Sequence, residues 1–199
     1  QANSSLISRM LGVKTDNIEE FEKANIGIKT IRIDKKGNPR ESMSFPKFKI
    51  LDFVQETFDN SELYNYFYEK RFLFVVFKEN MAGEYELIGS KFWNMPISDL
   101  EGIGKCEWEK YQSQFINGIE FEVKDNRISN NLLKSKETQI FHLRPHAQRS
   151  AYVINGIKYG NGTESDMDEL PNGNKMTKQC FWLNKKYVLK NIQDIIEGE

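Results

Sequence analysis

The chain has 199 residues, of which 39% are hydrophobic and 13% aromatic, and its formal net charge is −1. This composition is typical of a folded protein with a sizeable core and excludes an intrinsically disordered chain. No apolar run approaches the roughly 18 residues of a membrane span, and no signal peptide is visible, so we expect a cytoplasmic protein without a membrane partner. The first residue is Gln1, which indicates a fragment of a longer chain, and no linker divides residues 1–199, so we expect one domain.

The predicted elements begin with a short helix that runs from the serines near the amino terminus to Gly12. The stretch "NIGIKTIRIDKKGNPRES", Asn25 to Ser42, then predicts a β-hairpin with "KKGNP" as its turn. Gly27 and Lys29 lie two residues apart and therefore share one face of the first strand. A glycine is a poor strand former, so its presence beside this lysine calls for an explanation.

The middle of the chain predicts a helix, a strand and a second helix. Asn60 or Ser61 caps "ELYNYFYEK", and "RFLFVVFK" has the length of a strand that is buried on both faces. A second helix ends at Asn117 and Gly118. Its aromatic and aliphatic residues recur at helical spacing and are expected in the core: Trp108, Tyr111, Phe115 and Ile116.

The last part of the chain predicts the strands "IEFEV", "TQIFHLRP" and "QCFWL", followed by a final helix that Asn184 caps. The polar and glycine-rich residues 155–174 are expected to form a mobile loop. The order of elements predicts an α/β fold with a central mixed sheet flanked by helices.

Basic charge is concentrated near the carboxyl end, although the net charge is close to zero. Residues 126–193 contain 11 Lys or Arg against 5 Asp or Glu, whereas the rest of the chain contains 17 against 24. Such a bias fits either a nucleic-acid-binding surface or an ordinary solvated face. The two cysteines, Cys106 and Cys180, have no neighbouring thiol, and His142 and His146 flank Pro145, so neither pair predicts a metal site.

A strand that ends in acid-x-Lys, with a second acid upstream, is the arrangement of many metal-dependent nucleases, because two carboxylates hold Mg²⁺ and the lysine steadies the attacking water or the phosphate. Here the lysine is Lys29 and Glu20 is the possible upstream acid, but the position of the acid before the lysine is Gly27. With Glu41 and Arg32 nearby, a cross-strand ion pair is an adequate structural explanation of these charges.

The run from Asn25 to Ser42 resembles the active-site motif of the MutH mismatch-repair endonuclease family. Further segments resemble that family in the same order, from about Leu6 to Ile192: "RFLFVVF", "WEKYQSQFING", "IFHLRPHA" and "CFWLNKKY". The resemblance implies a restriction-endonuclease-like, MutH-type fold. It is greatest to the carboxy-terminal half of GATC-cutting type II restriction endonucleases of the Sau type, a half that binds DNA as an allosteric effector and does not cut.

The resemblance maps the family's acids onto Glu20 and Gly27, a further acid onto Ser8, and a helical lysine near Tyr68, while Lys29 is retained. It therefore implies a degenerate catalytic site without bound metal, and Mg²⁺ would serve only the catalytic amino-terminal half of the parent chain. The positions that would contact DNA keep donors or an aromatic ring. They are Arg144, Pro145, His146, Trp182, Lys185 and Lys186.

Three functions remain open from the sequence. The first is sequence-specific binding of GATC duplex by a non-catalytic half, which partners the amino-terminal catalytic domain through dimerisation or DNA looping. The second is an Mg²⁺-dependent endonuclease in which Glu20, Glu22 or Glu41 replaces the lost acid around Lys29. The third is a protein-interaction module that has lost DNA binding. Arg144, Trp182 and the two lysines also have an ordinary interpretation as surface or core residues.

Overall fold

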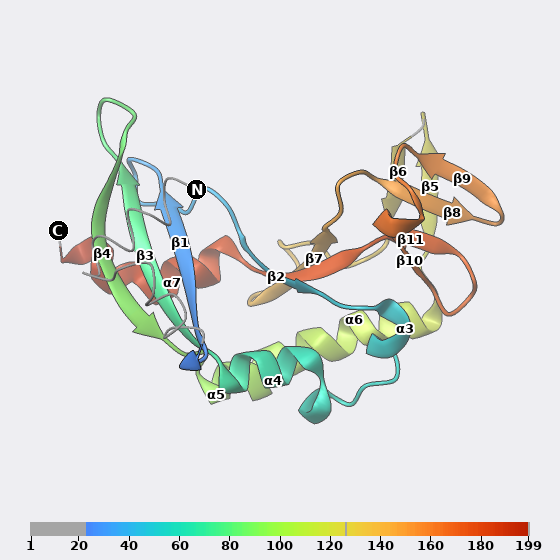
Figure 1. Cartoon of the computed structure of the whole chain (residues 1–199), viewed down its shortest axis with the longest axis horizontal. Helices are drawn as coiled ribbons and strands as arrows, with labels where there is room; N and C mark the ends of the chain where they lie inside the picture. Colours follow the sequence, from blue (N-terminus) through green and yellow to red (C-terminus); the bar gives the residue numbers. More distant parts are fainter. Residues whose placement is uncertain (1–22, 126, 199) are drawn as a thin grey trace.

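The computed structural model describes residues 23–125 and 127–198. The expected amino-terminal helix, including Ser8, lies outside the described residues, and so do Glu20 and Glu22. The molecule is elongated: the sheet β1-β3-β4 lies at one end, the sheets β10-β11-β8-β9 and β5-β6 lie at the other, the sheet β2-β12-β7 lies between them, and a long helix runs beneath (Figure 1).

The first sheet has the order β1-β3-β4, formed by β1 (Ile26–Ile33), β3 (Arg71–Glu79) and β4 (Tyr85–Trp93). Strand β1 runs parallel to β3, and β4 runs antiparallel to it. β3 carries six consecutive buried residues, from Phe72 to Phe77, which confirms the predicted two-sided burial of this strand. The final helix α7 (Lys185–Glu197) lies against this sheet (Figure 1), where Trp93 Nε1 donates to Asn191 Oδ1 at 2.9 Å.

The hairpin predicted from Asn25 to Ser42 forms only around its turn, so the prediction is wrong for its returning strand. The turn after β1 forms, because Asp34 accepts hydrogen bonds from Lys36 and Asn38, and an isolated bridge joins Ile33 to Pro39. Beyond this bridge the chain leaves β1, and strand β2 (Met43–Lys47) joins a different sheet. The predicted turn is therefore confirmed, but the strand that pairs with β1 along its length is β3, which is distant in sequence.

The second sheet has the order β2-β12-β7, with β7 (Phe141–Pro145) and β12 (Gln179–Leu183) both close to their predicted positions. β12 runs antiparallel to both neighbours. Smaller strands form the other end of the molecule: β5 (Phe121–Lys124), β6 (Arg127–Asn130), β8 (Ala151–Ile154), β9 (Ile157–Gly160), β10 (Met167–Glu169) and β11 (Lys175–Thr177).

The prediction that residues 155–174 form a mobile loop is also wrong. Strands β9 and β10 lie within this stretch, and β9 pairs with β8 across the tight turn at Asn155 and Gly156. β10 pairs with β11, which continues the same four-stranded sheet. The glycines that suggested mobility instead supply turns, since Gly156, Gly160 and Gly173 all have positive φ angles.

The helices begin and end largely where their capping residues predict. Ser61 caps α4 (Glu62–Glu69), and its hydroxyl accepts from the Tyr64 N–H at 3.1 Å. Helix α6 (Lys105–Asn117) ends at Gly118, whose φ of 99° suits glycine alone. The remaining short elements are α3 (Ile50–Phe53), α5 (Ile97–Asp99), the π-helical turn Leu100–Gly104 and the 3₁₀ turns Phe58–Asn60 and Glu164–Asp166.

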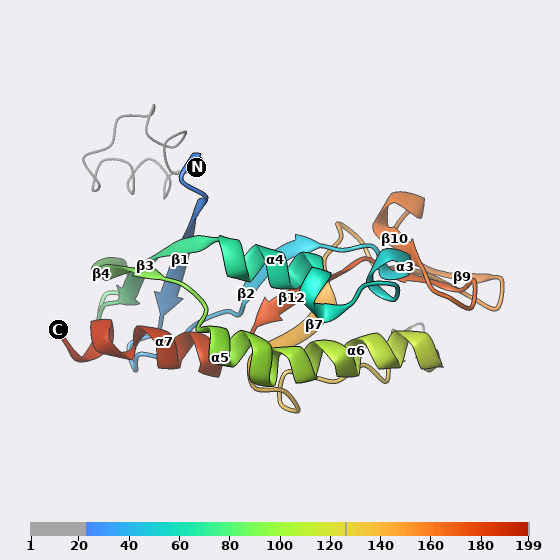
Figure 2. The ribbon, with the colours of Figure 1, turned by 90° about the horizontal axis from the view of Figure 1, so that it is seen from below.

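The main core lies between α6, the sheet β2-β12-β7 and the first sheet. Figure 2 shows these elements from below. Trp108, Tyr111 and Phe115 of α6 are buried in it as predicted, whereas Ile116 is exposed. A smaller cluster of Leu73, Val75 and Phe77 occupies the other face of β3. Within the described residues, no helix is long and apolar enough to cross a membrane.

Candidate nucleic-acid interface

Lys29 lies between the first two sheets. Gly27 and Lys29 do share one face of β1, the face on which Ile31 and Ile33 are buried. Lys29 Nζ donates to the Ser44 carbonyl oxygen of β2 at 2.8 Å and stands 4.7 Å from the centre of the Phe45 ring. The lysine therefore joins two sheets through a backbone acceptor and an aromatic ring.

A second lysine, Lys70, occupies the space next to Gly27. A Cβ atom built on Gly27 would stand 2.9 Å from Lys70 Cε and 3.2 Å from the Phe72 ring. The Lys70 ammonium lies 5.1 Å from the centre of the Tyr66 ring. Tyr68, near which the resemblance places the helical lysine of the MutH family, is exposed and stacks on Tyr64. The sequence comparison therefore missed Lys70, which the β1–β3 pairing brings to Gly27.

Burial lowers the pKa of Lys29, and the nearby positive charge of Lys70 lowers this pKa further. Glu41, one of the proposed replacement acids, instead forms a salt bridge with Arg32 at 2.7 Å. Residues 23–125 and 127–198 contain no group of three or more His, Cys, Asp or Glu side chains that could hold a metal ion. The described part of this site thus presents two cations and offers no carboxylate pair for Mg²⁺.

Arg144, Trp182 and His146 come together on one face of the second sheet. The register places Cys180 opposite Arg144 and Trp182 opposite His142, so these side chains share a face. The Arg144 guanidinium lies 5.0 Å from the centre of the Trp182 ring, and the His146 ring centre lies 6.1 Å from the Trp182 ring. Pro145 pairs with Gln179 at the end of the sheet. An exposed arginine stacked on an indole is well suited to contact a base edge or a phosphate.

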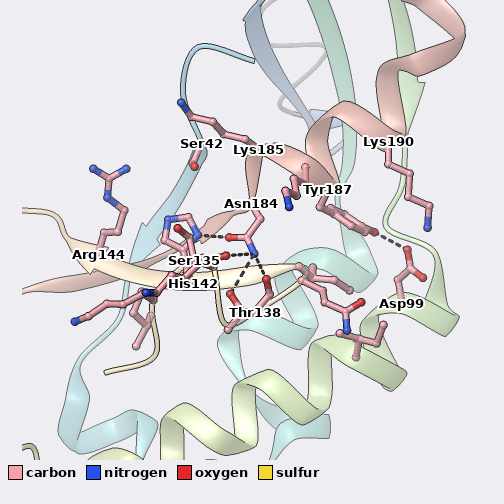
Figure 3. Close-up of a pocket in the computed structure, with 17 residues that line it drawn as sticks. Ser42, Asp99, Ser135, Thr138, His142, Arg144, Asn184, Lys185, Tyr187 and Lys190 are labelled. Carbon is pink, nitrogen blue, oxygen red and sulfur yellow. Dashed lines mark hydrogen bonds between the residues drawn. The ribbon is translucent and has the colours of Figure 1, made fainter. Parts of the chain in front are cut away.

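A pocket of about 900 Å³ adjoins Arg144 (Figure 3). Its walls come from the segment before β7, from β7 itself and from the first turns of α7. The basic residues that line it are Lys134, Lys136, Arg144, Lys185, Lys186 and Lys190. Asp99 is the one acidic lining residue, and its carboxylate accepts a hydrogen bond from the Tyr187 hydroxyl at 2.8 Å.

Asn184 connects the two walls of this pocket (Figure 3). Helix α7 begins directly after Asn184, as predicted, but the side chain does not cap the helix. Its Oδ1 bonds to the buried His142 Nδ1, and its Nδ2 donates to the Thr138 carbonyl oxygen at 2.9 Å and to Thr138 Oγ1 at 3.1 Å. The side chain therefore fixes the segment before β7 against the start of α7.

The sequence prediction found three of the six basic lining residues. Lys185 and Lys186 are both exposed, and Lys185 Nζ donates to the Arg40 carbonyl oxygen at 2.6 Å. Lys134, Lys136 and Lys190 were not singled out, although all three fall within the basic part of the chain. Their spacing gave no sign that two segments fifty residues apart face one another across a pocket.

The comparison with known proteins points to one class, the type II restriction enzymes. The chain is 35% identical over 202 aligned residues to the type II restriction enzyme Sau3AI of Staphylococcus aureus. The match covers 90% of this chain and 40% of that protein. No family model matches the chain. The chain is thus related to a restriction enzyme, and its mixed α/β architecture is consistent with a restriction-endonuclease-like fold.

Proposed function

We propose that this chain binds double-stranded DNA and does not cut it. The observation that carries the proposal is the basic pocket, which has six cationic side chains against one acid and in which one of the six, Arg144, is stacked on Trp182. Cationic side chains bind the phosphate backbone, while a guanidinium can read O6 and N7 of guanine in the major groove. The relation to a type II restriction enzyme supports a DNA partner.

The proposed target is duplex containing GATC, and the proposed role is that of the effector half of a longer restriction enzyme. In that enzyme a catalytic amino-terminal domain would cut, with Mg²⁺ as its cofactor. DNA held by the present chain would favour the cleaving state of that domain or bring two sites together by dimerisation or looping. The resemblance to the MutH family and the 40% coverage of the relative support this division of roles.

The surroundings of Lys29 support the proposed absence of cleavage. Gly27 offers no ligand, and Lys70 fills the adjacent space with a positive charge. A divalent ion next to two ammonium groups would be repelled, and Glu20 alone would supply too few oxygens to displace its waters. A lysine without a metal–carboxylate centre cannot generate the attacking hydroxide by itself.

The test is titration of fluorescent GATC and scrambled duplexes with the chain, in EDTA and in Mg²⁺, at several salt concentrations. We expect tighter binding to GATC than to the scrambled duplex. The logarithm of the binding constant should fall linearly with the logarithm of the salt concentration, with a slope of about −0.9 for each phosphate that the chain neutralises. Arg144→Ala should weaken GATC binding about 5- to 100-fold and reduce the preference for GATC. The control Lys110→Ala alters an exposed lysine of α6 that does not line the basic pocket.

Each alternative has its own outcome. Mg²⁺-dependent nicking that disappears in Lys29→Ala would show an active nuclease and refute the non-catalytic role. Equal affinity for GATC and scrambled duplexes would refute sequence specificity while leaving DNA binding. The absence of binding to any duplex at low salt would favour a protein-interaction module instead.

A further inference from the structure

We propose that Lys29 and Lys70 together form a metal-independent binding site for one DNA backbone phosphate, in which the Lys70 ammonium takes the place of a metal ion. This inference rests on the proposed DNA-binding function and assigns a role to a lysine that the sequence comparison left out. A catalytic site that had merely lost its acids would bind nothing, whereas the site proposed here binds a phosphate.

The first support is the balance of charge. The two ammonium groups are near enough for Lys70 to disfavour the charged form of Lys29. Within the described residues they contact neutral groups: the Ser44 carbonyl oxygen, the Phe45 ring and the Tyr66 ring. Neither lysine forms a salt bridge within the part of the chain that the structure describes. Two half-buried cations that repel each other would gain from an anion between them.

The second support is the space at Gly27. Any side chain at this position would meet Lys70 and Phe72, as the positions of Lys70 Cε and the Phe72 ring show. Glycine therefore both removes a carboxylate and lets the Lys70 side chain approach β1. The Lys70 ammonium belongs to the chain itself, so a phosphate at this place would need neither a carboxylate nor a metal ion to bind.

The third support is position. Lys29 donates to the backbone of Ser44, and Ser44 pairs with Trp182 across β2 and β12. Trp182 in turn stacks against Arg144. The two lysines are therefore only one strand away from the residues proposed to read DNA. A duplex that contacts Arg144 would bring its backbone toward this site, and its phosphates carry the oxyanions that ammonium groups bind.

The experiment measures the affinity and salt dependence of GATC binding for the whole chain and for Lys29→Gln, Lys70→Gln and the double variant, in EDTA and in Mg²⁺. We expect each single variant to bind about tenfold more weakly, with the salt slope reduced by about 0.9, the value for one phosphate. Because both lysines hold the same phosphate, the double variant should lose little more slope than either single one. EDTA should change none of these values.

Two further arms sharpen the test. Lys110→Gln serves as the matched control, since this exposed lysine lies on α6 and should leave affinity and slope unchanged beyond the small effect of one distant charge. Gly27→Glu places a carboxylate against both lysines, so it should compete with the phosphate and weaken binding without restoring cleavage. Lys29→Gln also loses the bond to Ser44, so urea unfolding of each variant separates a folding defect from a binding defect.

Failure of the wild-type chain to bind DNA would refute the proposed function. Wild-type binding with an unchanged affinity and slope in folded Lys70→Gln would instead refute only this inference. A slope that falls twice as far in the double variant would refute the shared phosphate, and a contribution that vanishes in EDTA would show that a metal ion holds the phosphate.

Discussion

The carboxylate of Glu107 should be the most sensitive single group for the stability of strand β7. Glu107 projects from α6 and is buried, with 5% of its surface exposed. Its Oε2 accepts from the N–H groups of Ile140 at 3.1 Å and Phe141 at 2.8 Å, and its Oε1 accepts from the Gln139 N–H. One side chain thus satisfies three backbone donors where β7 begins.

The substitution Glu107→Gln keeps the shape and removes the charge. The remaining amide oxygen can still accept from Ile140 and Phe141, but the new NH₂ group faces the Gln139 N–H, so one donor loses its acceptor. A hydrogen bond to a charged group contributes about 1.5–3 kcal/mol. We therefore expect the free energy of unfolding to fall by roughly 2–3 kcal/mol, which lowers Tm by roughly 4–12 °C for a chain of this size.

The measurement is urea unfolding followed by tryptophan fluorescence, together with a thermal scan. Glu109→Gln provides the matched control, because Glu109 lies on the same helix but is exposed, and such substitutions change stability by about 0.5 kcal/mol or less. Equal unfolding midpoints for the two variants would refute the reasoning that the buried carboxylate anchors the start of β7.

Three further predictions concern stability. Asn184→Ala should lower the free energy of unfolding, measured by urea unfolding, by about 2–4 kcal/mol, because it leaves buried polar groups on both walls of the pocket without a partner. A loss below about 0.5 kcal/mol would contradict this. Burial lowers the pKa of His142, so the unfolded chain binds the proton more readily, and stability should fall as the pH drops from 7.5 to 5.5. His142→Gln should flatten this dependence, and an unchanged pH profile would count against it. Gly160→Ala should cost more than Gly83→Ala in thermal unfolding: both glycines have positive φ angles, but only at Gly160 would a Cβ meet backbone, 2.2 Å from the Ser150 carbonyl oxygen. Equal losses would show that this contact relaxes.

Much of the local structure could be predicted because local signals determine it. Ser61 and Gly118 mark helix ends through hydrogen bonding and a positive φ, and both act within a few residues. The apolar run of β3 has the length of a strand, and a continuous apolar run of this length is typical of a strand buried on both faces. The errors arose where pairing is non-local, since nothing near β1 indicates that its partner is β3 and not β2.

The candidate site divides in the same way. Arg144 and Trp182 were proposed as site residues because the resemblance carried over strand by strand, and the register of β7 and β12 brings them together. Lys70 was missed because its proximity to Gly27 depends on the parallel register of β1 and β3, not on spacing along the chain. Asn184 was expected to act locally as a cap, but its side chain bonds to residues more than forty positions away.

Helix α7 connects the basic pocket to the first sheet. Its first turns supply Lys185, Lys186 and Lys190 to the basic pocket, and its later turns are fixed to β4, where Asp194 forms a salt bridge with Lys91 at 2.7 Å. β4 belongs to the sheet that carries Lys29. A 13-residue helix is about 20 Å long and does not stretch. It therefore fixes the lysines of its first turns relative to the sheet that carries Lys29.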